Sequence, residues 1–145
     1  MRCFDRIHSL REQLSLWRKE GQTLALVPTM GNLHAGHFAL VTRAQEVAQR
    51  VVVTIFVNPT QFVEGEDYTA YPRTFAADRQ ALDALGADLL FHPPVSEMYP
   101  EGMRQQTLVT VAGLDDILCG KFRQGHFAGV ATVVTKLFNI TQPDV

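Results

Sequence analysis

Two histidines, His34 and His37, lie three residues apart in a segment that could bind phosphate. The segment, residues 28–37, joins an apolar run to a run with helical spacing. A helix start presents unpaired N–H groups and the positive end of a dipole, which both attract phosphate. Gly31 and Gly36 lack a Cβ atom, so a ligand can approach the backbone there. The imidazoles could donate hydrogen bonds to phosphate oxygens whose charge grows in a transition state.

Competing interpretations of this segment can be ranked by chemistry. The glycine spacing matches the GxxxxG of a P-loop, but His37 and Phe38 stand where that motif needs Lys and Ser/Thr, which excludes a Walker ATPase. Solvated surface histidines remain an alternative, although a pair that brackets a glycine at a strand-to-helix turn favours function. A metal pair is a third alternative; no carboxylate or cysteine flanks the histidines, and H-E-x-x-H is absent.

Two carboxamides follow the next apolar run, residues 51–57. Asn58 and Gln61 each offer two donors and an acceptor, which suits a substrate with hydroxyls and a carboxylate. Such side chains orient a ligand without adding a charge. The bland alternative is that Asn58-Pro59 forms only a turn.

The elements that would position these side chains follow from hydrophobic periodicity. Residues 23–27, 51–57 and 87–91 are predicted to be buried strands, and residues 106–111 alternate as a half-exposed strand would. Helices are predicted over residues 10–20, with a Ser9-x-x-Glu12 capping box, and over 74–85, closed by Gly86. Two further apolar helical faces are predicted. One contains Leu40, Val41, Ala44, Val47 and Ala48. The other, predicted to pack in the core, contains Val130, Val133, Val134, Leu137 and Phe138.

Strands that alternate with helices predict βαβ units, and therefore an α/β fold with a mostly parallel sheet flanked by helices. In such sheets ligands bind beyond the carboxyl ends of the strands. The segments that follow Val27 and Val57 should therefore share one crevice.

Composition narrows the class of protein. The length of 145 residues suits one domain. The 13 Lys+Arg against 15 Asp+Glu give a formal charge of −2, which argues against a general nucleic-acid binder. No apolar run approaches membrane-spanning length, and no signal peptide is visible. Cys3 and Cys119 are far apart, which favours reduced thiols in a cytoplasmic protein.

Several sequence motifs resemble those of a known protein family. His34-Ala35-Gly36-His37 resembles the H-x-G-H signature of the nucleotidylyltransferase superfamily. More specific strings are PTMGNLHAGH (28–37), IFVNPTQF (55–62), YPRT (71–74), GHFAGV (125–130), KLFN (136–139) and QPD (142–144). Together, in this order, they resemble the pantoate–β-alanine ligase (pantothenate synthetase) family along essentially the whole chain.

The resemblance implies a Rossmann-like fold and a two-step reaction. ATP, accompanied by Mg²⁺, and pantoate would form pantoyl-adenylate and pyrophosphate; β-alanine would then attack, giving pantothenate and AMP. His37, as proton donor, and His34 would be catalytic, Gln61 would bind pantoate and β-alanine, and Asn58 would help hold pantoate; no metal-ligating residue is implied. The implied ATP-binding residues are Met30, Gly31, Asn32, Leu33, His34, Ala35, Gly36 and His37.

The resemblance also implies organisation and partners. Family members continue into a lysine-bearing motif, a serine/arginine loop and a smaller second domain. Residues 1–145 are therefore expected to be the N-terminal nucleotide- and pantoate-binding domain, without the C-terminal domain. We expect this domain alone to show little turnover. The implied partners are small molecules and a second copy in a homodimer, with neither nucleic acid nor membrane. Alternatives are another H-x-G-H nucleotidylyltransferase and a catalytically silent dimerising module. The acidic cluster Glu64, Glu66 and Asp67 could assist a metal, but a solvated loop is the favoured interpretation. The basic group Lys121, Arg123 and His126 could meet ATP phosphates or a carboxylate, and capping and solvent exposure explain it nearly as well.

Overall fold

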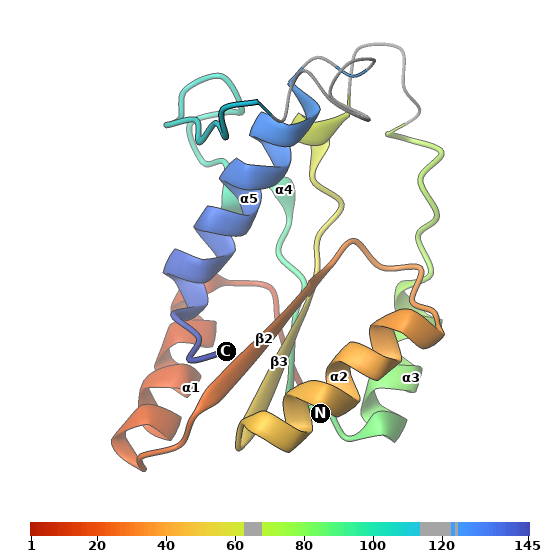
Figure 1. Ribbon diagram of the computed structural model, residues 1–145, viewed down its shortest axis with the longest axis vertical. Helices are drawn as coiled ribbons and strands as arrows, with labels where there is room; N and C mark the ends of the chain where they lie inside the picture. The colour runs from red at the N-terminus through yellow and green to blue at the C-terminus, as the bar shows by residue number, and fades with distance from the viewer. Residues whose placement is uncertain (63–67, 114–122, 124) are drawn as a thin grey trace.

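A four-stranded parallel sheet runs through the centre of the computed structural model, which describes residues 1–62, 68–113, 123 and 125–145. The strands are β1 (Arg2–Phe4), β2 (Leu24–Thr29), β3 (Arg50–Ile55) and β4 (Leu89–Phe91), in the order β1-β4-β3-β2. Every neighbouring pair is parallel. The predicted α/β fold is therefore confirmed (Figure 1).

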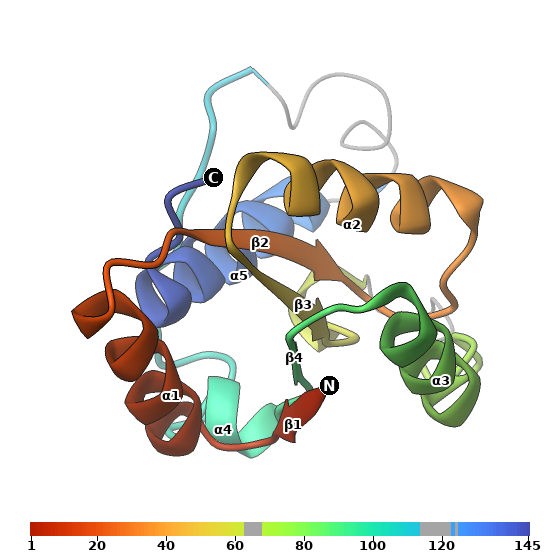
Figure 2. The ribbon, with the colours of Figure 1, turned by 90° about the horizontal axis from the view of Figure 1, so that it is seen from below.

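Helices cover both faces of the sheet. α1 (Ile7–Lys19) and α5 (His126–Thr141) lie on one face, and α2 (Ala35–Val47) and α3 (Phe75–Leu85) lie on the other (Figures 1 and 2). A 3₁₀ turn, η1 (Pro59–Gln61), follows β3, and a short helix, α4 (Val95–Met98), follows β4. The structure is thus a three-layer arrangement around the sheet.

The sequence of β3 shows why the sheet is central. Val52 packs against the α1 and α5 side, whereas Val51 and Val53 pack against the α2 and α3 side. Because both faces are covered, the strand is apolar almost throughout, as strands of parallel sheets are.

The register of β2 and β3 places the two predicted functional segments side by side. Thr29 is paired with Ile55, and the Phe56 N–H donates to the Thr29 carbonyl at 3.0 Å. Both strands therefore end at the same edge, and the loops with the histidines and carboxamides leave the sheet together.

The predicted start of the first helix is wrong. Helix α1 begins at Ile7, and its N-cap, Arg6, makes no side-chain cap, so Ser9 and Glu12 lie inside the helix. Glu97 of α4 supplies the missing acceptor: it receives the Ile7 N–H at 2.8 Å and the Arg6 guanidinium at 3.0 Å. The Ile7 N–H, and then Arg6, lower the pKa of Glu97.

The strand predicted at residues 106–111 is also wrong. No strand forms there; the Val109 N–H instead donates to the Thr132 hydroxyl of α5 at 2.9 Å. No neighbouring strand of the described chain completes a ladder here, and the apolar side chains Leu108 and Val111 are exposed. The short elements β1 and α4 were not predicted from the sequence.

Helix faces and ends agree with expectation only in part. Gly86 closes α3 with a left-handed φ of +82°, as predicted. On α2, Val41 and Ala44 are buried, but Leu40 is 56% exposed. On α5, Phe138 is 48% exposed and leaves the predicted core face. Cys119, Lys121 and the acidic cluster at residues 64–67 lie outside the described residues.

Within the described chain, no helix combines the length and apolar character needed to cross a membrane.

Candidate functional site

A tight turn after β2 brings the chain to α2. Gly31 and Asn32 both adopt left-handed backbone conformations, with φ of +83° and +52°. A Cβ atom on Gly31 would lie 3.2 Å from both an Asp78 carboxylate oxygen and Ile55 Cγ2. Glycine is needed here for its φ and for this close approach, while asparagine tolerates the left-handed region better than most residues.

Protein acceptors hold the backbone of this turn. The Gly31 N–H donates to the Thr29 hydroxyl at 3.2 Å, and the Asn32 and Leu33 N–H groups each donate to Asp78 at 2.9 Å. Three N–H groups of the segment expected to bind phosphate therefore point to protein oxygens. The donors available to an anion lie further along, at the start of α2.

The two histidines cap α2 in a reciprocal arrangement. His34 Nδ1 accepts the Gly36 N–H at 3.1 Å, and His37 Nδ1 accepts the His34 N–H at 3.4 Å. Their ring centroids are 4.2 Å apart. Because both Nδ1 atoms act as acceptors, each neutral ring carries its proton on Nε2. The pair thus offers two Nε2–H donors at a helix N-terminus, where an anion is favoured.

The electrostatics around His37 favour its neutral form. Burial lowers the pKa of His37 below its ordinary value, and His34 lowers it further, while the Asp78 carboxylate acts in the opposite direction. An anionic ligand at Nε2 would favour the protonated ring. Neutral His37 can therefore donate a hydrogen bond from Nε2, whereas a second proton, on Nδ1, would break the bond that Nδ1 accepts from the His34 N–H.

Asn58 is buried and fully engaged by the protein. Its Oδ1 accepts from the Tyr99 hydroxyl at 2.7 Å and from the Thr60 hydroxyl at 3.0 Å. Its Nδ2 donates to Gln61 Oε1 at 3.1 Å and to the Gly129 carbonyl at 3.2 Å. Both amide donors are thus used, so Asn58 anchors η1 and orients Gln61.

Gln61 links the two loops. Its Nε2 donates to the Met30 sulfur at 3.0 Å, and its backbone carbonyl lies 2.8 Å from His126 Nδ1. A thioether is a weak acceptor. A hydroxyl or carboxylate oxygen of a ligand could therefore replace Met30 as the partner of Nε2.

A crevice of about 280 Å³ lies between these loops and α5. His37, Gln61 and Met30 line it directly, with Tyr71 beside them. His34 lies against His37, and Asn58 lies behind Gln61. The structure thus gathers the four predicted side chains at one edge of the sheet, and two of them line the crevice.

Sequence reasoning missed part of the crevice wall. Val130, Val133, Val134 and Leu137 of α5, predicted as core, also line the crevice, together with Tyr71. Periodicity cannot separate a helix face that packs on the core from one that also borders a cavity. The YPRT and GHFAGV strings, at residues 71–74 and 125–130, are the sequence signals that lie at this wall.

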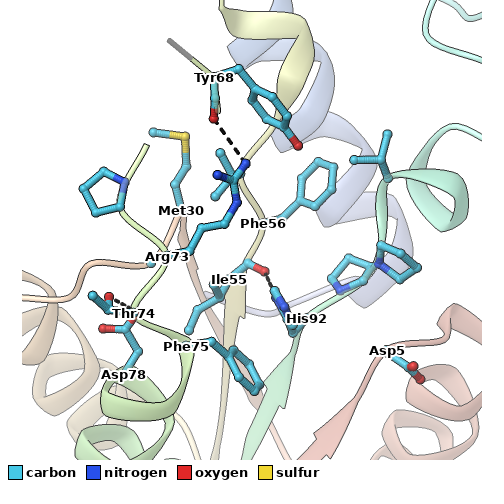
Figure 3. A pocket seen from close by; sticks show the side chains of 16 residues that line it. Asp5, Met30, Ile55, Phe56, Tyr68, Arg73, Thr74, Phe75, Asp78 and His92 are labelled. Atoms are coloured by element: carbon cyan, nitrogen blue, oxygen red, sulfur yellow. Dashed lines mark hydrogen bonds between the residues drawn. The ribbon is translucent and has the colours of Figure 1, made fainter. Parts of the chain in front are cut away.

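A larger pocket, of about 490 Å³, shares Met30 and Phe56 with the crevice (Figure 3). Its walls are mainly apolar, and several of its polar side chains bond within the protein: the Thr74 hydroxyl donates to Asp78 at 2.9 Å, and Arg73 donates to the Tyr68 carbonyl at 3.1 Å. His92 Nδ1 donates to the Ile55 carbonyl at 2.7 Å. The imidazole pair makes the smaller crevice the better match for phosphate chemistry.

Residues 1–62, 68–113, 123 and 125–145 contain no group of three or more His, Cys, Asp or Glu side chains arranged to hold a metal ion.

Comparison with known proteins gives a consistent assignment. The model of the pantoate-beta-alanine ligase family matches residues 2–145. The chain is 58% identical over 139 residues to the pantothenate synthetase of Shewanella baltica (strain OS223), covering 96% of this chain and 50% of that protein. It is 59% identical to the pantothenate synthetase of Shewanella loihica, again covering 96% of this chain and 49% of the relative.

Solved structures show the same fold. Pantothenate synthetase from Thermus thermophilus superposes with a TM-score of 0.89 at 49% identity, covering 99% of this chain and 50% of that one. Pantoate-beta-alanine ligase from Francisella tularensis, solved with beta-gamma ATP and beta-alanine, superposes with a TM-score of 0.89 at 39% identity, covering 99% of this chain and 54% of that one. The chain spans about half the length of these relatives. With a family match from residue 2 to residue 145 and this agreement in fold, the chain belongs to the pantoate–β-alanine ligase family.

Proposed function

We propose that the chain is the nucleotide- and pantoate-binding domain of an enzyme that joins pantoate to β-alanine at the expense of ATP. The observation that carries the proposal is the crevice that His37 and Gln61 line together, with an imidazole pair on one side and a carboxamide on the other. A triphosphate and a small hydroxy acid have complementary chemistry to these groups.

In the proposed first step, a pantoate carboxylate oxygen attacks the α-phosphorus of ATP. A new O–P bond forms, the bond to the β-phosphate bridging oxygen breaks, and pyrophosphate leaves. His34 and His37 would donate from Nε2 to phosphate oxygens, which are the atoms on which charge increases. His37 would also serve as proton donor, to an oxygen of the departing pyrophosphate. Mg²⁺ would enter with ATP, on its phosphates.

In the proposed second step, the free amine of β-alanine attacks the acyl carbon of pantoyl-adenylate. The amide C–N bond forms, the acyl C–O bond to AMP breaks, and the proton that the nitrogen loses passes to water. Gln61 Nε2 would orient the pantoyl group and the incoming amine, after exchanging Met30 for a ligand oxygen. Residues 30–37 would bind ATP, and Asn58 would act by holding Gln61.

Binding to the 145-residue chain tests the proposal first. Calorimetry with MgATP and with pantoate should detect both ligands, and His37→Ala should weaken MgATP binding. His8→Ala is the matched control, because His8 is an exposed side chain on α1 that pairs only with Glu12 in the described structure. A chain that binds a phosphate ester but not pantoate would indicate another nucleotidylyltransferase.

Turnover can be tested by joining the chain to the remaining half of the Shewanella baltica relative. In that chimera, His37→Ala should slow the formation of pantoyl-adenylate by about 100-fold or more, as expected for the loss of a preorganised donor. Quenched single-turnover assays of adenylate and pyrophosphate measure this step. An unchanged rate in His37→Ala would remove His37 from the mechanism.

Two further properties belong to this proposal. Met103, Leu108 and Val111 are between 46% and 60% exposed and lie in one segment, which supports self-association as a homodimer. Sedimentation of the chain tests it, since a monomer at all concentrations would refute it. Cytoplasmic location is supported by Cys3, which is a free thiol in the structure.

A further inference from the structure

Asp78 is a buried carboxylate that touches neither wall of the small crevice. It lies in the first turn of α3 and is only 5% exposed. Three groups donate to it at 2.9 Å: the Asn32 N–H, the Leu33 N–H and the Thr74 hydroxyl. Three donors compensate much of the cost of burying an ionised carboxylate.

These contacts join the turn after β2 to the segment that precedes α3. On one side, Asn32 and Leu33 come directly before the capping pair His34 and His37. On the other side, Thr74 follows Arg73, whose guanidinium donates to the carbonyls of Tyr68, Thr69 and Tyr71 at 3.1, 2.8 and 3.5 Å. Figure 3 shows Asp78 bonded to Thr74, with Arg73 reaching Tyr68 above them.

We propose that Asp78 is a positioning residue for the imidazole pair: by holding the N–H groups of Asn32 and Leu33, it fixes where His34 and His37 meet the polyphosphate of the nucleotide. The identity of the ligand rests on the proposed function, whereas the positioning of His34 and His37 by Asp78 does not. Each carboxylate oxygen of Asp78 accepts one backbone N–H of the turn, so the position of the turn relative to Asp78 is fixed at two points. Through Thr74 the same carboxylate braces the segment that brings Tyr71 to the crevice.

The charge of Asp78 also acts on His37. Its carboxylate raises the pKa of His37, against the effects of burial and of His34. Removing the charge should therefore lower the pKa of His37 further, in addition to loosening the turn.

The test uses the 145-residue chain with Asp78→Asn. An amide offers one acceptor and one donor group, so one of the two backbone N–H groups must face an NH₂ group. Asp88→Asn is the matched control, because Asp88 also accepts a backbone N–H, from Val51 at 2.8 Å, and a guanidinium, from Arg50 at 2.7 Å, but at the amino ends of the strands.

The first readout needs no ligand. Long-range ¹H–¹⁵N spectra report which imidazole nitrogen carries the proton. In the unmodified chain, His34 and His37 should both show the Nε2–H tautomer. Asp78→Asn should shift these signals and lower the pKa of His37 in a pH titration, whereas Asp88→Asn should leave both unchanged. Identical spectra for Asp78→Asn and the unmodified chain would overturn the proposal.

The second readout is MgATP binding by calorimetry. Asp78→Asn should weaken it by about tenfold, the range expected when charge-assisted hydrogen bonds are lost, and Asp88→Asn should not. Equal weakening in both variants would reduce Asp78 to a structural role. If the unmodified chain bound no MgATP while the imidazole signals still moved, the proposed function would fail and the positioning role would stand. Should Asp78→Asn not fold, Thr74→Val removes one of the three donors and leaves the charge of Asp78 in place. It should move the imidazole signals without lowering the pKa of His37, and no movement would refute the proposal.

Discussion

Replacing Gly129 with alanine should displace Gln61, although alanine is usually the better residue inside a helix. Gly129 lies in α5, where the glycine-to-alanine change alone would stabilise the helix by about 1 kcal/mol. In this structure, however, the added Cβ would lie 2.4 Å from the Thr60 carbonyl oxygen, 2.7 Å from its carbonyl carbon and 2.9 Å from Gln61 Cα.

All three atoms belong to the backbone of η1, so no side chain can turn aside to make room. Ordinary carbon contacts are about 3.5–4.0 Å, and η1 must therefore move by about 1 Å. Overpacking of this kind costs about 1–3 kcal/mol, which offsets or exceeds the helical gain. A shift of about 1 Å in a positioning group can reduce a rate by about 100-fold. We therefore expect near-normal stability but a severe loss of pantoate binding and of adenylate formation.

The assay compares urea unfolding of the 145-residue chain, pantoate binding to it, and single-turnover adenylation by the chimera. Gly21→Ala is the control: Gly21 has a left-handed φ of +74° and nothing within 4 Å of the added Cβ. It should lose about 1–2 kcal/mol through backbone strain and keep its ligand binding. A Gly129→Ala chain that is more stable by about 1 kcal/mol and binds pantoate normally would refute the packing analysis.

Three other predictions concern the same edge of the sheet. Burial and His34 hold the pKa of His37 below its ordinary 6.5, so the unfolded chain takes up a proton before the folded chain as pH falls. The contribution of His37 to the free energy of unfolding should therefore decrease below about pH 6.5 and level off below the pKa of the folded state. Urea titrations across pH would show this decrease, which should be absent in His37→Gln. Tyr99→Phe removes the 2.7 Å hydrogen bond to Asn58 and should cost about 1 kcal/mol in urea unfolding. Asn58→Asp sets a carboxylate against the Gly129 carbonyl and should cost several kcal/mol at neutral pH, with partial recovery when acid protonates the carboxyl; equal stability at pH 7 would contradict the buried network.

The layers of the fold were predictable because local patterns agree with global burial. The β-branched run of β3 is buried on both faces, and Gly86 closes α3 through a conformation that its sequence signal implied. The positions of His34, His37, Asn58 and Gln61 at one edge also followed, since adjacent parallel strands end together.

What could not be predicted depends on contacts between distant residues. Nothing near Ile7 in the sequence shows that Glu97 will cap its helix, and nothing near Asn32 points to Asp78. Asn58 is a similar case: its amide suits a substrate, but the fold surrounds it with Tyr99, Thr60 and Gly129 and uses its donors internally.

The walls of the crevice come from segments near opposite ends of the chain, since Thr29 and Met30 face Val134 and Leu137 across it. A molecule seated there touches an early strand and the last helix at once. A bound ligand therefore connects β2 and α5 by non-covalent contacts, and it must dissociate before α5 can separate from the sheet. Proteolytic nicking of α5 should consequently follow the occupancy of the crevice, protected while it is filled and exposed as it empties.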